Sequence, residues 1–419
     1  MEGSPKVSER PNAVTDALPD LLFSDSERAL TDSLGSLLAD RGGVDKALAR
    51  TESAQTYDDK LWQAVAVDLG CAGLLIGERD GGAGASYREA AAAAEVLGSF
   101  VAPVPFLGSA VVATTAFVSV ATGALSNAAS GGWGVGSSGT PFTPAKAASD
   151  LLRRMADGGV TAALAVPFAT APGSAFPASV RVAGPRPGDA AAGVARLRGT
   201  VTGVADALPA GVLLVPADGV PQGLYLVDMS ASGVAKAPVV SLDMTRQLCD
   251  LSFDDAPGTL IASGPAASRA LDVALDAGAG ILAAEQIGLA QRCLDMTVAY
   301  VKERRQFARP VGSFQGLKHR LADLWVAITQ ARAASRYAAA CLASGAPDTK
   351  VAVALAKAYC SEVAVNAAQE CVQMHGGIGF TWEHPAHLYL KRAKADSIGF
   401  GTPDAHRAAL ASLVNLPAP

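Results

Sequence analysis

The period of the hydrophobic pattern changes twice along this chain, and this change constrains the fold more than any other feature of the sequence. Between residues 23 and 157, apolar residues recur mainly at helical spacing. Between residues 158 and 264, the apolar segments become short and rich in β-branched residues, and glycine or proline separates them. From residue 265 to residue 419, long helical patterns return. This order predicts a multidomain α+β chain with an N-terminal helical domain, a middle β domain and a C-terminal helical domain.

Local signals refine this division. Residues 1–22 contain three prolines and no apolar period, so we expect them to form a loose arm. Ser24 then precedes a helical pattern with acidic residues in its first turn, which is typical of a helix start. In the C-terminal domain, the pattern predicts further helices over Gln315–Ala343 and Pro347–Met374.

The composition excludes several classes of function. Half of the residues are hydrophobic, 17% are charged and the net charge is -5, which describes a globular protein with no electrostatic preference for nucleic acid. The six cysteines form no CxxC pair, and His384 and His387 lack a complete set of further ligands nearby in the sequence. We therefore expect no metal site and no nucleic-acid partner.

The same composition bears on location. The first residues lack the apolar segment of a secretory signal, and buried thiols are typical of a reducing compartment, so we expect a cytoplasmic protein. The most apolar stretch, Gly108–Leu125, is rich in alanine, threonine and serine. We predict that it forms a buried core helix and that the chain has no membrane span.

Three stretches carry residues suited to a functional site. A glycine-rich turn covers residues 73–84, where a purely structural turn is an equally good interpretation. The second stretch, residues 303–315, reads ERRQFARPVGSFQ, and the third, residues 373–381, reads QMHGGIGFT. Arginine forms bidentate contacts with phosphate, and paired glycines after a helix let the backbone approach a pyrophosphate closely. The second and third stretches therefore predict a site for an anionic small molecule.

In this order and spacing, the three stretches resemble the acyl-CoA dehydrogenase family, and the resemblance extends from about residue 22 to residue 416. It implies an N-terminal helical domain, a middle β-barrel-like domain and a C-terminal four-helix bundle. It also implies FAD as cofactor, an acyl-CoA substrate, and a dimer in which each subunit grips the ADP part of a flavin bound mainly by its neighbour. The resemblance assigns flavin contact to Arg304, Gln306, Phe307, Phe314, Gln315, Gln373, Gly376 and Gly377.

The chain departs from the family at the catalytic base. The reaction needs a carboxylate to remove the α-proton of the thioester. In most members this is a glutamate after the third stretch, where Phe400 stands here; a minority carry it on the first long C-terminal helix, at or near Gly278. Neither residue accepts a proton, so we predict no catalytic base in this chain. Glu285 lies about two turns, or ~10 Å, further along that helix, and the backbone direction argues against Asp396 or Asp404 reaching the same point.

The middle domain departs as well. Residues 166–175 and 203–205 correspond to stretches that hold the flavin ring in the family, but their acidic residues, tryptophan and threonine are missing from the expected positions. The ADP-gripping half of the site therefore looks intact, whereas the ring-binding half looks degraded.

This asymmetry resembles heteromeric members of the family. In these, two unlike chains assemble as α2β2, one flavin serves each unlike pair, and the substrates are bulky, such as steroid side-chain CoA thioesters. We therefore predict a subunit that contributes the FAD-gripping half, while a homologous partner supplies the catalytic glutamate. Two alternatives stay open: a homo-oligomeric acyl-CoA dehydrogenase whose base has moved to Glu285 or Asp404, and a flavin-free scaffold on the same fold.

Overall fold

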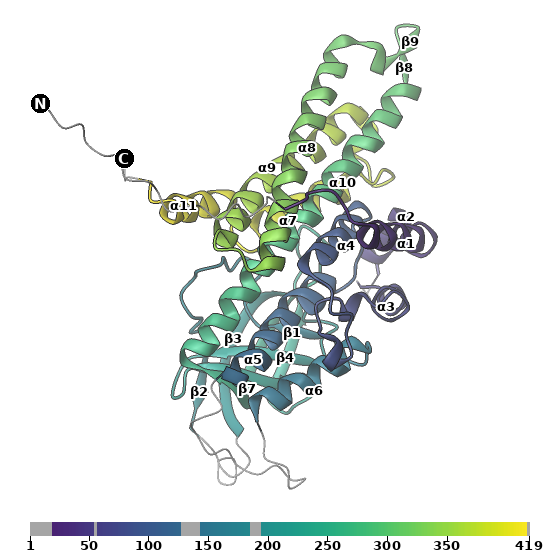
Figure 1. The fold of residues 1–419 in the computed structure, drawn as a ribbon. Helices are drawn as coiled ribbons and strands as arrows, with labels where there is room; N and C mark the ends of the chain where they lie inside the picture. Colours follow the sequence, from purple (N-terminus) through teal and green to yellow (C-terminus); the bar gives the residue numbers. More distant parts are fainter. Residues whose placement is uncertain (1–18, 54–56, 127–142, 185–193, 417–419) are drawn as a thin grey trace, which may run out of the picture.

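The computed structural model describes residues 19–53, 57–126, 143–184 and 194–416. Nearly all of the predicted N-terminal arm, residues 1–22, lies outside this part. The described chain forms a helical layer, a β-sheet and a long helical bundle that projects away from the sheet (Figure 1). The α+β order expected from the hydrophobic pattern is confirmed.

The N-terminal helices begin where the sequence supplies caps. Helix α1 (Asp25–Arg41) starts with a capping box between Ser24 and Glu27, and α4 (Tyr87–Ser99) starts with one between Ser86 and Glu89. The other elements of this layer are α2 (Val44–Thr51), α3 (Asp59–Gln63), η1 (Ala64–Asp68), η2 (Cys71–Gly73), η3 (Glu78–Asp80), η4 (Phe106–Ala113), α5 (Thr114–Ser126) and α6 (Pro144–Ala156).

Within the part of the chain that the structure describes, three segments are long and apolar enough to cross a membrane by length and composition alone. They are Phe106–Gly123, Gly264–Glu303 and Thr349–Phe380, and 78%, 94% and 67% of their most apolar windows are buried inside the protein. Their hydrophobicity thus serves the interior of this fold. The first of them covers most of the predicted core helix and consists of η4 and the start of α5.

The sheet contains β1 (Ala162–Leu164), β2 (Val180–Ala183), β3 (Val194–Ala205), β4 (Val212–Ala217), β5 (Gly223–Asp228), β6 (Val234–Pro238) and β7 (Leu248–Ser263). Its order is β1-β4-β5-β7-β3-β2, with β6 paired to β7, and of its pairs only β1–β4 is parallel. Arg181 of β2 forms an isolated bridge with Asp218, directly after β4. The far end of the sheet thereby curls back toward its beginning, which makes the domain barrel-like as expected.

The C-terminal bundle is built around α7 (Gly264–Glu303), which α4, α5, α8 (Gln315–Ser344) and α9 (Thr349–His375) surround. Small side chains along α7 let its neighbours approach closely; a Cβ at Gly288 would lie 1.7 Å from the Glu95 carbonyl oxygen in α4. Helices α10 (Ala386–Ile398) and α11 (Pro403–Leu413) pack on α9 and complete the domain.

Candidate functional site

The second and third stretches of the sequence meet at the projecting end of the bundle. Tyr300, in the last turn of α7, stacks on His375, the last residue of α9, with ring centroids 4.4 Å apart. Arg304 directly follows α7, and Gln373 lies in the last turn of α9. The structure thus brings together two groups of predicted flavin contacts that lie far apart in the sequence.

A short hairpin forms the tip of this end (Figure 1). Its strands are β8 (Arg305–Gln306) and β9 (Arg309–Pro310), and Phe307 at its turn adopts a positive φ and is 86% exposed. The Phe314 ring lies 6.1 Å from the Phe307 ring, and the Arg309 guanidinium lies 3.9 Å above the centroid of the Phe314 ring. The hairpin thus places a large aromatic side chain at the surface of the molecule.

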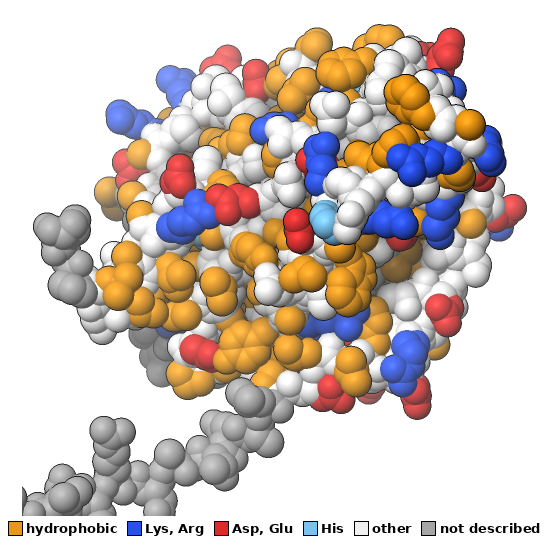
Figure 2. Space-filling model, turned by 90° about the horizontal axis from the view of Figure 1, so that it is seen from above, with side chains coloured by type: hydrophobic (Ala, Val, Ile, Leu, Met, Phe, Trp, Pro, Cys, Tyr) orange, Lys and Arg blue, Asp and Glu red, His pale blue; other side chains and the backbone are white. Residues whose placement is uncertain are grey.

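The glycines of the third stretch present bare backbone. Gly376 ends α9 with φ +62°, and an added Cβ at Gly376 or Gly377 would meet no atom within 4 Å. Arg304, Gln306, Gln315 and both glycines are exposed. Exposed guanidinium groups after the end of α7 and open glycine backbone after the end of α9 suit the pyrophosphate of FAD, provided that another chain holds the rest of the cofactor. Seen from above, apolar and basic side chains are interspersed on the molecular surface (Figure 2).

A cavity of about 380 Å³ lies elsewhere, between the sheet and α10. Its lining includes Pro167, Phe168, Ala169 and Gly203, which belong to the stretches matched to the flavin ring, together with Arg246 and Ile398. The size is that of a small-molecule pocket. However, the Gly203 N–H donates to Asp250 and its carbonyl accepts from the Phe168 N–H, so this backbone is already satisfied within the chain. The ring half of the site keeps a cavity but offers no free backbone donor at Gly203.

The two positions expected to carry a base face each other. Phe400 is 4% exposed, and a Cβ built on Gly278 would lie 2.8 Å from Cζ of its ring and 2.9 Å from Cγ2 of Val112. The Phe168 ring packs edge-to-face on the Phe400 ring, with ring centroids 5.4 Å apart. Aromatic and aliphatic atoms therefore occupy the space where either carboxylate of the family would act.

Neither alternative acid is placed to replace the base. Glu285 is buried and its Oε1 accepts from Arg246 Nη2 and Arg392 Nη1, each at 2.5 Å. Burial raises the pKa of Glu285, but the two guanidinium groups outweigh it and hold the pKa below its usual value. Such a carboxylate is a poor proton acceptor. Asp404 lies exposed at the start of α11 and pairs with Arg407 at 3.1 Å.

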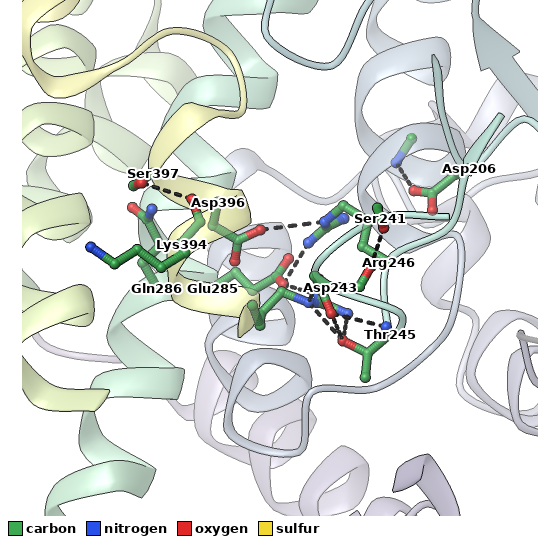
Figure 3. Close-up of polar contacts among 12 residues, drawn as sticks. Asp206, Ser241, Asp243, Thr245, Arg246, Glu285, Gln286, Lys394, Asp396 and Ser397 are labelled. Atoms are coloured by element: carbon green, nitrogen blue, oxygen red, sulfur yellow. Dashed lines mark hydrogen bonds and ion pairs between the residues drawn. The ribbon is translucent and has the colours of Figure 1, made fainter. Parts of the chain in front are cut away.

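Glu285 belongs to a group of ionisable side chains that the sequence reasoning missed. We call it the buried charge cluster: Asp206, Asp243, Arg246, Glu285, Arg392 and Asp396. Side chains from α7 and α10 point toward the loop between β6 and β7, beside the cavity (Figure 3). Each of its members is at most 6% exposed.

The ion pairs of the cluster do not balance its charge. Arg392 Nε lies 2.7 Å from Asp243 Oδ2, and Arg246 Nε lies 3.4 Å from Asp396 Oδ1. Three carboxyl groups thus share two guanidinium groups, and the fourth, Asp206, accepts from the Gly108 N–H at 2.8 Å. Burial, with the neighbouring Glu285, raises the pKa of Asp396 to about 7. The sequence signal for this cluster was charged residues, such as Glu285, within otherwise apolar helical runs.

The comparisons with known proteins agree with this architecture. Residues 269–414 match the family model of the acyl-CoA dehydrogenase C-terminal domain. The chain is 31% identical over 381 residues to acyl-CoA dehydrogenase IpdE2 of Mycolicibacterium smegmatis, covering 91% of this chain and 96% of that protein. It is 32% identical over 369 residues to IpdE2 of Mycobacterium tuberculosis, covering 88% and 91%.

Solved structures include similar chains. One belongs to a variant of the Tcur3481–Tcur3483 steroid ACAD, with 28% identity, a TM-score of 0.76 and coverage of 93% of this chain and 98% of that one. Another belongs to the ChsE4–ChsE5 complex from Mycobacterium tuberculosis, with 24% identity, a TM-score of 0.77 and coverage of 96% and 100%. At that identity the second likeness concerns the fold alone.

Proposed function

Because the chain belongs to the acyl-CoA dehydrogenase family, we propose that it is the subunit without a catalytic base in a heteromeric, FAD-dependent acyl-CoA dehydrogenase. The observation that carries this proposal is the contact between Phe400 and Gly278, which fills both base positions with atoms that accept no proton. The carboxylate then comes from a homologous partner subunit.

The reaction is the α,β-dehydrogenation of an acyl-CoA thioester. A base removes the α-proton, and FAD, when bound, accepts the hydride from the β-carbon. This chain contributes binding: Arg304 would neutralise the charge of the pyrophosphate, and the backbone N–H groups at Gly376 and Gly377 would hold it. The exposed Phe307 on the hairpin would contact the cofactor.

The likenesses support a heteromer and a bulky substrate. The similar chain at 28% identity belongs to the Tcur3481–Tcur3483 protein, which is named for two components and is described as a steroid ACAD. We therefore extend the proposal to a partner from the same family and to a steroid-derived acyl-CoA substrate.

The two alternatives predict different behaviour. A relocated base is disfavoured because Glu285 is held by two arginines and Asp404 lies at the surface. A flavin-free scaffold needs no pyrophosphate contacts, and the exposed Arg304 and the open backbone at Gly376 and Gly377 would then serve no ligand.

Co-expression tests the proposal. The chain is produced alone and together with a homologue that carries the glutamate, and flavin absorbance and acyl-CoA oxidation are measured on each preparation. We expect acyl-CoA oxidation only from the complex and not from the chain produced alone. We expect the complex to lose this activity when the partner's glutamate is changed to glutamine. Turnover by the isolated chain with its own bound flavin would refute the proposal.

Arg304→Ala tests the cofactor contact. Losing a charge-assisted contact with phosphate costs roughly 1.5–3 kcal/mol, which corresponds to about 10- to 150-fold weaker FAD binding. The matched control is Arg407→Ala. It removes an arginine of α11 that pairs with Glu362 of α9 and with Asp404 of α11. The affinity for FAD is measured by titrating FAD into the apo complex. Equal affinity of the Arg304 and Arg407 variants would favour the scaffold.

A further inference from the structure

Three aromatic rings pack against one another at the projecting end of the bundle. Tyr300 belongs to the last turn of α7, His375 is the last residue of α9, and His384 lies between α9 and α10. The centroid of the His375 ring lies 4.4 Å from that of Tyr300 and 4.2 Å from that of His384, with interplanar angles of 30° and 41°. We call these three residues the ring cluster; its central ring joins three separate segments of the chain.

The central ring is held in one orientation. His375 is 3% exposed, and its Nδ1 donates to the Cys371 carbonyl at 2.6 Å. Because a carbonyl oxygen only accepts, Nδ1 carries a proton, and the imidazole cannot turn over without losing this bond. The following residues fold back over the helix end, where a Cβ at Gly379 would lie 3.1 Å from the His375 Cβ and 2.6 Å from the Val372 carbonyl oxygen. The ring cluster therefore has a rigid centre.

The backbone connects the ring cluster to the residues assigned to FAD. The Tyr300 carbonyl accepts from the Arg304 N–H at 2.9 Å, which ties Arg304 to the last turn of α7. On the other side, Gly376 and Gly377 directly follow His375. The stacking of Tyr300 on His375 therefore joins the helix end that carries Arg304 to the helix end that carries the two glycines.

This connection matters because several groups hold a pyrophosphate at once, and the affinity depends on their spacing being set before the ligand binds. The ends of helices fray, since their last carbonyl groups lack partners within the helix. We propose that the ring cluster positions Arg304, Gly376 and Gly377 for the pyrophosphate of FAD. The inference rests on the proposed function and deepens it, because it assigns positioning residues to the cofactor site.

The affinity of the apo complex for FAD, measured by titration, tests this role. Tyr300→Leu removes the ring, and we expect about 3- to 10-fold weaker binding, the effect of losing one aromatic pair. Tyr300→Phe keeps the ring and should restore the affinity of the wild type. His384→Leu removes the other ring that contacts His375 and should weaken binding in the same direction.

The matched control is Tyr359→Leu. It removes a half-buried tyrosine of α9 that donates to Gln330 and lies about 24 Å along the helix from His375. We expect this variant to bind FAD as the wild type does. Urea unfolding verifies that each variant is folded.

A double-mutant cycle separates positioning from a general loss of stability. If the ring cluster acts through Arg304, Tyr300→Leu should weaken FAD binding less in an Arg304→Ala background than in the wild type.

Three results would each overturn the inference: folded Tyr300→Leu and His384→Leu variants that bind FAD as the wild type does, a Tyr300→Phe or Tyr359→Leu variant that binds as weakly as Tyr300→Leu, or additive effects of Tyr300→Leu and Arg304→Ala. Failure of the proposed function is read separately, because Arg304→Ala alone would then leave the affinity for FAD unchanged.

Discussion

Replacing Glu285 by glutamine distinguishes a structural carboxylate from a relocated base. The substitution keeps the shape of the side chain and removes the charge that both Arg246 and Arg392 contact at 2.5 Å. Arg392 keeps Asp243 at 2.7 Å, whereas Arg246 keeps only the longer contact with Asp396 at 3.4 Å. The variant therefore leaves one buried guanidinium poorly compensated.

The expected loss follows from these contacts. Removing one partner of a buried ion pair costs about 3–5 kcal/mol of the free energy of unfolding. Glu285 also contributes to the raised pKa of Asp396, so its neutralisation lets Asp396 ionise more readily and offsets part of the loss. We expect a value near the lower end, about 3 kcal/mol, at pH 7.5.

Urea unfolding of the purified variant measures this loss. The matched control is Glu362→Gln, which removes a half-exposed glutamate paired with Arg407 and should cost about 1 kcal/mol or less. The reasoning is refuted if Glu285→Gln is as stable as wild type. If the Glu285→Gln variant keeps the stability of the wild type but loses turnover, Glu285 is the relocated base.

Two further predictions concern the same region. Because the pKa of Asp396 is raised to about 7, the stability that this residue contributes is fully present below pH ~4 and is lost as the pH rises toward about 7. At pH 8, Asp396→Asn should therefore have a free energy of unfolding that exceeds the wild-type value by up to ~4 kcal/mol, measured with urea. A difference between the two proteins that does not shrink when the pH is lowered to 5 would contradict this. Gly278→Ala places a methyl group 2.8 Å from the Phe400 ring and should lower the free energy of unfolding, measured with urea, by about 1–3 kcal/mol. Adding Phe400→Leu should recover part of this stability. If the effects of the two changes are additive, the contact between the two residues does not matter.

The sequence was informative wherever the signal is local. Periodicity predicted the order of helical and β segments, because the spacing of apolar residues reports which face of an element is buried. Ser24 predicted the start of α1, since a cap needs only residues within one turn. The residues at the two expected base positions were also readable, because a phenylalanine or a glycine cannot accept a proton in any fold.

Contacts between distant segments were decided only by the tertiary structure. Nothing in the sequence shows that Phe400 packs on Gly278, because such contacts depend on how α7 and α10 lie against each other. Glu285 could be read as a spare base until two arginines from other segments were seen to hold it. The chemistry of a buried charge depends on its neighbours in space, and the order of residues along the chain does not specify these neighbours.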